Sequence, residues 1–335
     1  MNTRQPINVL IDIEKPDLFE SSNLRNVDVS EKIQTMRIGA FEINEPVPQL
    51  EQPIVVAMLK PWIDVGRVGT LTLGKIEQSV DAKELGRLDR PGTFFDFTRY
   101  RPRIKITDGI RSFVTPNSEI KYGQDDQSGQ DYIFLHLREP HSMSEDYIDS
   151  VVSVIEHFGV SEYYRVGGMY DTVPHSRPLL VTGTLNPEKT ELVADLISNG
   201  SPSYQGPTSI VNLVAESLEQ SSVDCSSLMV HLPQYAQLQE DHMGSATLLS
   251  ILCALCDLPK TLSDSTRGNQ QYQEISRAVK LNPELQKLIS QFEAYHDRIL
   301  DGQETSAGDF NLSPEIEEFL KSVSERLDDQ NTTIG

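Results

Sequence analysis

Short, uninterrupted runs of apolar residues, many of them β-branched, recur along this chain, and segments with helical periodicity separate them. Such a run is typical of a strand that is covered on both faces of a sheet. The runs span residues 54–59, 132–137, 163–166, 179–184 and 228–232. The helical patterns span residues 66–80, 144–158, 187–198, 208–218 and 245–257. This alternation predicts an α/β fold with a mainly parallel central sheet and helices on both of its faces.

The helix expected at residues 144–158 has the clearest pattern. Ser144 can cap its first turn, Gly159 can end it, and the apolar residues between them recur on one face. A different pattern interrupts the alternation at residues 94–115. There an aromatic run, Phe94–Phe97, reads as a strand, and Asp108-Gly109 reads as the turn of an antiparallel hairpin. The sequence therefore predicts a mixed sheet rather than a purely parallel one.

The two ends of the chain differ from this core. Residues 1–52 are polar, contain four prolines and show no sustained periodicity, so we expect a loosely held N-terminal arm before a core of residues 53–259. A C-terminal helical extension is expected over residues 260–330, followed by a flexible tail at residues 331–335. The extension has one apolar stripe of Leu285, Leu288, Ile289, Phe292, Tyr295 and Ile299, and a second of Ile316, Phe319, Leu320, Val323 and Leu327. These stripes either dock on the chain's own core, pair with each other, or form an interface with a partner.

The 335-residue chain has a formal net charge of −21, from 50 acidic and 29 basic residues. That charge repels phosphate backbones and anionic lipid headgroups, so neither nucleic acid nor a membrane is expected as a partner. The sequence has no signal-peptide pattern and no apolar segment long enough to span a bilayer, which predicts a cytoplasmic protein. Its three cysteines cannot form a closed set of disulfides, in agreement with a reducing compartment.

Two short motifs resemble chemical sites but fit a structural role better. Gly69–Lys75 matches a phosphate-binding loop until Ile76, which stands where a hydroxyl residue would hold magnesium. Cys253 and Cys256 have the spacing of a redox pair but lie late in an apolar helix. The fingerprints of serine hydrolases, zinc proteases and dinucleotide-binding proteins do not occur in the sequence. We therefore expect no catalytic residue, no metal site and no cofactor.

The loops that follow the expected strands hold the candidate binding residues. Gly167 and Gly168 follow one strand and lead into Asp171, His175 and Arg177. Ligands of open α/β sheets bind beyond the carboxyl ends of the strands, and adjacent glycines allow a close backbone approach. His175 and Arg177 would offer a titratable group and a forked donor. Alternatively, Asp171, His175 and Arg177 bond to one another and to the loop backbone, and only fix a turn.

Two further turns lead into expected helices. Trp62 and Asp64 lie between the first strand and the first helix, where Asp64 is a natural cap. Tyr204, Gly206 and Thr208 belong to a second turn of this kind. Capping explains that turn, but its free N–H groups could instead hold an anion.

Several of these segments share one order and spacing. They are Trp62-x-Asp64-x-Gly66, Phe94-Phe95-Asp96-Phe97, Arg101-Pro102 with Asp108-Gly109, Gly167-Gly168, Pro174-His175-Ser176-Arg177-Pro178 with Val181-Thr182-Gly183-Thr184, and Tyr204-x-Gly206-Pro207-Thr208. In that order they resemble the PAC2 family, the proteasome assembly chaperone 2-like proteins, in its bacterial branch. The similarity runs from about Ile54 to Leu258, and Pro174–Pro178 and Tyr204–Thr208 are its most specific segments.

The resemblance implies a phosphorylase-like α/β sandwich with a mixed central sheet and a C-terminal helical extension. It also implies self-association into a homo-oligomer, for which a trimer is one form. Family members whose role is known are chaperones that bind proteasome α-type subunits, or activators that dock on the 20S particle. A protein partner is therefore expected in addition to self-association, with proteasome-related proteins among the candidates.

The leading hypothesis from the sequence is a non-enzymatic, homo-oligomeric binding or assembly protein. The alternative is an enzyme or sensor that binds a small anionic or nucleoside-like ligand in the strand-end crevice. The residues expected to bind the ligand or partner are Trp62, Asp64, Asp96, Gly167, Gly168, His175, Arg177, Tyr204, Gly206 and Thr208. One open pocket that joins them would favour the ligand hypothesis, whereas separate groups that are bonded internally would count against it.

Overall fold

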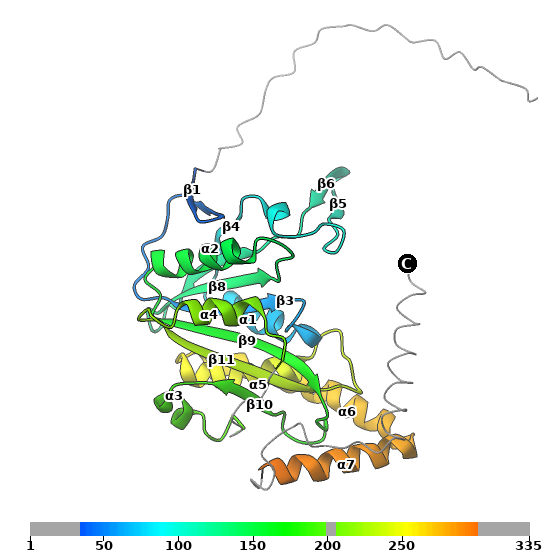
Figure 1. The fold of residues 1–335 in the computed structure, drawn as a ribbon. Helices are drawn as coiled ribbons and strands as arrows, with labels where there is room; N and C mark the ends of the chain where they lie inside the picture. Colours follow the sequence, from blue (N-terminus) through cyan, green and yellow to red (C-terminus); the bar gives the residue numbers. More distant parts are fainter. Residues whose placement is uncertain (1–33, 199–205, 301–335) are drawn as a thin grey trace, which may run out of the picture. The chain divides into compact units, whose positions relative to one another are not determined.

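A computed structural model of the protein describes residues 34–198 and 206–300 (Figure 1). Within these residues, nine strands form one mixed sheet, in the order β1-β2-β4-β7-β8-β3-β9-β11-β10, and β5 and β6 form a separate two-stranded sheet. Helices pack on both faces of the large sheet, where two hydrophobic clusters fill the space between the layers. The predicted α/β class and the mixed sheet are confirmed, and the parallel pairings lie at the centre of that sheet.

The parallel centre of the sheet consists of β3 (Ile54–Lys60), β8 (Asp131–Arg138), β9 (Glu162–Asp171) and β11 (Asp224–Pro233). β3 lies between β8 and β9 and pairs with both of them in parallel. Because helices cover both faces, its residues from Val55 to Leu59 are at most 1% exposed. β10 (Val181–Thr184) adds an antiparallel strand at the edge beside β11.

Four antiparallel strands that the sequence analysis did not identify extend the other side of the sheet. They are β1 (Thr35–Ile38), β2 (Phe41–Asn44), β4 (Lys83–Leu88) and β7 (Glu119–Gln124). The expected arm of residues 1–52 is therefore wrong for β1 and β2, which belong to the sheet; residues 1–33 lie outside the described residues. Phe41 and Ile43 alternate with polar residues and are buried, but two apolar positions are too short a pattern to recognise.

One face of the sheet is covered by α1 (Val68–Ser79) and α5 (His242–Leu255), and α6 (Thr266–Lys280) packs beside α5. The opposite face is covered by α2 (Ser144–His157) and α4 (Ile210–Ser217). The remaining helices are α3 (Pro187–Leu192), α7 (Pro283–Leu300) and the 3-10 turns η1 (Val65–Arg67), η2 (Pro91–Thr93) and η3 (Lys260–Ser263). In the described segments, no helix combines the length and the apolar character that a membrane span requires.

Local differences from the expected elements have local causes. Ser144 is the first residue of α2 and not its cap, because Met143 before it adopts a left-handed backbone conformation. The expected strand Phe94–Phe97 is instead a turn after η2. The rings of Phe94 and Phe95 pack edge-on against Tyr147 of α2, with centroid distances of 5.3 and 6.1 Å, so this aromatic run serves the core.

The expected hairpin forms from β5 (Arg103–Thr107) and β6 (Ile110–Val114). Asp108 and Gly109 at its turn have φ angles of 51° and 79°. A two-residue turn with positive φ at both positions matches the twist of the two strands, which explains the Asp-Gly pair. The hairpin does not join the large sheet, and all ten of its strand residues are exposed.

The first C-terminal stripe docks on the chain's own core. Leu288, Ile289, Phe292 and Tyr295 of α7 are all at most 5% exposed. The second stripe, with the tail at residues 331–335, lies outside the described residues. The described part of the extension, α6 and α7, therefore packs through its apolar face. This agrees with the alternative in which the stripe docks on the chain's own core.

The two motifs that resembled chemical sites belong to the core. Gly69–Lys75 lies inside α1, where Leu73 is buried and the Lys75 ammonium donates to the Leu262 carbonyl at 3.3 Å. Cys253 and Cys256 are buried, and burial raises the pKa of their thiols to about 11 and about 12. Both thiols are therefore protonated at neutral pH and poorly suited to redox chemistry.

Candidate functional site

The structure distributes the candidate residues over separate places instead of one pocket. Trp62 and Asp64 lie beside Gly167 and Gly168, since Asp64 and Gly168 form an isolated parallel bridge. Asp96 lies on a turn, Gly206 and Thr208 precede α4, and His175 and Arg177 face α6 and α7. Tyr204 lies outside the described residues.

Asp64 accepts hydrogen bonds from the first turn of α1, although Arg67 occupies the N-cap position of that helix. Its carboxylate accepts the backbone N–H of Thr70 at 2.9 Å and the Thr70 hydroxyl at 2.5 Å. Burial raises the pKa of Asp64, and these hydrogen bonds oppose that effect. The carboxylate is thus used within the chain, as its interpretation as a cap predicted.

Gly167 and Gly168 allow the preceding loop to approach the sheet closely. A Cβ atom at Gly167 would lie 2.6 Å from the Ile63 carbonyl oxygen, and one at Gly168 would lie 2.6 Å from Cγ2 of Val68. The close approach expected of these glycines therefore occurs, but the chain's own backbone and side chains make it. Trp62 next to this contact is 61% exposed.

Asp96 stabilises an exposed turn. Its carboxylate accepts the backbone N–H of Thr98 at 2.8 Å and the Thr98 hydroxyl at 2.7 Å. These hydrogen bonds lower the pKa of Asp96. Its backbone N–H donates to Nδ1 of His141 at 3.3 Å, which joins the turn to the loop after β8.

The turn before α4 holds an anion that the chain itself supplies. The Ile210 N–H at the beginning of the helix donates to Oε1 of Glu139 at 3.2 Å. Burial raises the pKa of Glu139 in spite of this hydrogen bond. Gly206 and Thr208 are exposed, and the Thr208 hydroxyl accepts from the Asn212 side chain at 2.6 Å. The anion site considered for this turn is thus filled by Glu139.

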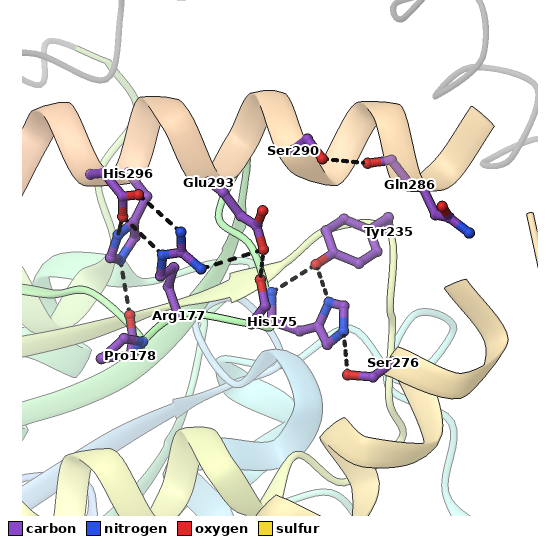
Figure 2. A network of polar contacts seen from close by, with 11 residues as sticks. His175, Arg177, Pro178, Tyr235, Ser276, Gln286, Ser290, Glu293 and His296 are labelled. Carbon is purple, nitrogen blue, oxygen red and sulfur yellow. Dashed lines mark hydrogen bonds and ion pairs between the residues drawn. The ribbon is translucent and has the colours of Figure 1, made fainter. Parts of the chain in front are cut away.

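His175 is buried in a network of neutral hydrogen bonds (Figure 2). Its Nδ1 lies 2.7 Å from the Tyr235 hydroxyl and its Nε2 lies 2.9 Å from the Ser276 hydroxyl. Because Ser276 donates its own proton to the Tyr272 carbonyl at 3.0 Å, Nε2–H of His175 must donate to Ser276. Nδ1 then accepts from Tyr235. The ring is neutral in this arrangement, and burial lowers the pKa of His175.

Arg177 is paired with carboxylates of α7 (Figure 2). Its Nε and Nη2 atoms each donate to Asp297 at 2.9 Å, and Nη1 lies 3.4 Å from Oε1 of Glu293. These contacts raise the pKa of Arg177, and the hydrogen bonds from Arg177 lower the pKa of Asp297. A forked arginine–carboxylate pair fixes direction as well as charge, so it sets how α7 lies on the loop.

Two further contacts hold α7 against the same loop. Nε2 of His296 is 3.0 Å from the Pro178 carbonyl, and the rings of Phe292 and Tyr235 stack with their centroids 6.0 Å apart. Asp171 takes no part in this network, because its carboxylate binds His231. The alternative in which Asp171, His175 and Arg177 bond to one another and to the loop backbone is thus correct only for the bond from the Thr172 N–H to Asp171, at 2.6 Å. The other side-chain partners of the three residues come from other elements.

A cavity of about 590 Å³ adjoins the His175–Pro178 loop. His175, Arg177, Met243, Tyr272 and His296 contribute to its lining, whereas Asp64, Asp96 and Gly206 do not. Since α7 supplies two carboxylates to Arg177, that guanidinium gives the cavity little net positive charge. In the described parts of the chain, no group of three or more His, Cys, Asp or Glu side chains could hold a metal ion.

The partners of these loops were not predicted from the sequence. Glu293 and Asp297 are four residues apart, so they project from one side of α7, beside its apolar stripe. Two carboxylates at that spacing indicate that a basic side chain of another segment binds this side of the helix. His231, which binds both Asp171 and Thr182, carried no such signal, since it stands alone in an apolar strand.

Comparisons with known proteins agree with this architecture. The sequence model of the PAC2 family matches residues 58–280 of the chain. No functionally curated protein matches it.

Three similar crystal structures cover almost the whole length of their own chains. A Corynebacterium glutamicum protein of unknown function is 20% identical with a TM-score of 0.70, and the match covers 79% of this chain and 99% of that one. A Mycobacterium tuberculosis protein of unknown function is 22% identical with a TM-score of 0.68, over 80% and 92% of the two chains. A Mycobacterium tuberculosis proteasome-assembly chaperone homologue is 20% identical with a TM-score of 0.63, over 70% and 99%.

Proposed function

This chain belongs to the PAC2 family, and we propose that it is a chaperone-like binding or assembly protein that forms a homo-oligomer and acts through its protein surfaces. The proteasome-assembly chaperone homologue among the similar structures supports a role in protein assembly. The candidate residues support it as well, because most of their polar groups are bonded within the chain. A protein partner, proteasome-related or other, is part of this proposal, as is a cytoplasmic location.

The observation that carries the proposal is the exposed hairpin. On one face of its two strands, Ile104, Ile106 and Phe113 are 55%, 70% and 67% exposed. Ile104 stands opposite Phe113 in the register, so their side chains share that face. An isolated two-stranded hairpin is marginally stable in water, and an apolar face of this kind marks an interaction site.

The charge of the hairpin indicates what covers it. Residues 99–114 include five basic residues and one acidic residue, a local charge of +4 in a chain whose net charge is −21. The rest of the chain therefore has −25, and a second copy presents a strongly acidic surface to this basic segment. We accordingly assign the apolar face of the hairpin to contact with a second copy of the chain. Burial of each large side chain would contribute about 1.5–3 kcal/mol.

Native mass spectrometry tests this assignment. The wild-type protein is expected at a multiple of 37.6 kDa, and the double variant Ile106→Glu, Phe113→Glu is expected at 37.6 kDa, because two carboxylates would be buried against an acidic surface. Higher salt should weaken the oligomer, since it screens the attraction between hairpin and acidic surface.

Leu281→Glu is the matched control, because Leu281 is 87% exposed and lies outside the hairpin. It should leave the oligomer unchanged. A wild-type protein that stays monomeric at all concentrations would contradict the proposal, as would a double variant that keeps the wild-type mass. Gentle purification from the source cells adds a second readout: a co-purifying protein supports the assembly role and identifies the partner.

The cavity beside His175 favours the alternative, a ligand-binding enzyme or sensor. An anionic ligand would bind weakly in this cavity, because Arg177 already binds Asp297 and Glu293. A small molecule retained on a clean homo-oligomer in the native spectrum would nevertheless favour this alternative over assembly.

A further inference from the structure

Three polar side chains form a line across the last three strands of the sheet. His231 of β11 lies in the middle. Its Nδ1 is 2.7 Å from Oδ2 of Asp171 on β9, and its Nε2 is 2.8 Å from the hydroxyl oxygen of Thr182 on β10. A carboxylate, an imidazole and a hydroxyl in this order are the parts of a nucleophile activated by a general base.

The surroundings of Asp171 determine which ring nitrogen of His231 carries the proton. Burial alone would raise the pKa of Asp171, but hydrogen bonds from His231 and Thr172 outweigh burial and lower it. The ionised carboxylate accepts Nδ1–H of His231, and Nε2 is then the acceptor for the Thr182 hydroxyl. The arrangement at rest is therefore the one in which His231 can remove the hydroxyl proton.

The line lies where a small molecule can reach it. Asp171 ends β9 and His231 is near the end of β11, so both lie at the carboxyl edge of the parallel strands, the usual ligand position in such sheets. Asp171 and Thr182 are partly exposed. Met169, which stands opposite His231 in the register, is 43% exposed.

An exposed apolar side chain flanks the line, because Met169 stands beside His231 and is 43% exposed. An apolar acyl group suits this neighbour better than a charged group does.

We propose that Thr182, His231 and Asp171 form an acyl-transfer site for esters or thioesters of small apolar acids. Thr182 is the nucleophile, His231 is the general base and acid, and Asp171 is a positioning residue. This activity goes beyond the proposed binding function and does not depend on it. It also differs from the sequence-based expectation of a non-enzymatic protein. That expectation rested on the absence of linear motifs, and residues from three separate strands form no such motif.

The reaction balances with water as the co-reactant. The Thr182 oxygen attacks the substrate carbonyl carbon while its proton passes to Nε2 of His231. The bond from the carbonyl carbon to the leaving oxygen or sulfur breaks, and His231 gives the proton to the leaving group. Water then attacks the acyl-threonine ester with His231 as base, which releases the acid and restores the hydroxyl of Thr182.

Acylation by p-nitrophenyl acetate tests the proposal on the full chain. We expect a burst of p-nitrophenolate and an acetyl group on Thr182, located by peptide mass spectrometry. Thr182→Ala should abolish acetylation at position 182, and His231→Gln should lower the acylation rate by about 10²–10⁴-fold, the usual effect of losing a general base. Thr182→Ser should keep the burst and carry the acetyl group at position 182. Asp171→Asn should slow the burst without reducing its final amplitude.

Thr184→Ala is the matched control, since Thr184 is an exposed hydroxyl on the same strand, and it should react like the wild type. A thermal melt of each variant separates loss of reaction from loss of folding. The proposal is overturned if no acetyl group forms on Thr182, or if the group forms at the same rate in folded His231→Gln. In either case the three side chains only brace the strands.

Discussion

The substitution His175→Ala tests whether the His175–Pro178 loop anchors the C-terminal helices. His175 is 7% exposed and its ring joins Tyr235 to Ser276 of α6. We expect the alanine variant to fold and to be clearly less stable, because the ring is replaced by a void between the loop and α6.

The magnitude follows from the contacts that are lost. Two neutral side-chain hydrogen bonds contribute about 1 kcal/mol each. The void left by a buried ring costs about 1–2 kcal/mol more, and the retained contact from the His175 N–H to the Tyr235 oxygen limits the loss. The free energy of unfolding should therefore fall by about 3–4 kcal/mol. For a chain of this length that corresponds to a melting temperature lower by about 4–6 °C.

Urea unfolding followed by circular dichroism measures this loss. His157→Ala is the matched control, because His157 is an exposed histidine near the end of α2. It should change the free energy of unfolding by no more than about 0.5 kcal/mol. If His175→Ala were as stable as His157→Ala, the hydrogen-bond network around His175 would not anchor the extension, and the structural interpretation of this loop would fail.

Three further outcomes follow from the same structure. Burial holds the pKa of folded His175 below its unfolded value of 6.5, so unfolded chains take up the proton first as the pH falls. The stability advantage of wild type over His175→Ala should thus be complete above pH 6.5 and shrink below it, as urea unfolding at several pH values can measure. Arg177→Ala removes the fork to Asp297, so backbone amides of α7 should exchange hydrogen faster than in wild type while those of β3 do not. Gly167→Ala should lower the free energy of unfolding by at least about 1–3 kcal/mol, because its Cβ would lie 2.6 Å from a backbone oxygen, whereas Gly74→Ala inside α1 meets open space and should raise it by about 0.5–1 kcal/mol.

Continuous burial made the centre of the sheet predictable. β3 and β8 are covered on both faces, so their sequences need almost no polar residue, and the runs stand out. β4 does not stand out, because Gly86 and a register shift between Glu84 and Gly86 interrupt its alternation. A Cβ atom at Gly86 would lie 2.4 Å from the Glu42 carbonyl oxygen. Gly86 is thus required by a contact with β2, and local sequence gives no sign of that contact.

Local sequence also located the polar loops but not their partners. The bond from Asp64 to Thr70 spans six residues, and a role of Asp64 at the start of the helix was predicted. His175 binds Ser276, and Arg177 binds Asp297, across 101 and 120 residues. At such separations the partner is chosen by how the helices pack, and a single sequence holds no pattern from which that choice can be read.

These long-range bonds change what the Pro174–Pro178 segment means. As a ligand site, its histidine and arginine would require an open pocket and free donors. His175 instead has both ring nitrogens occupied, and the Arg177 fork is occupied by Asp297. The segment and the extension therefore form one structural unit. Removal of α7 would leave Arg177 without its carboxylates and would expose the ring face of Tyr235 on which Phe292 stacks. The extension therefore stabilises the core and is not an independent appendage.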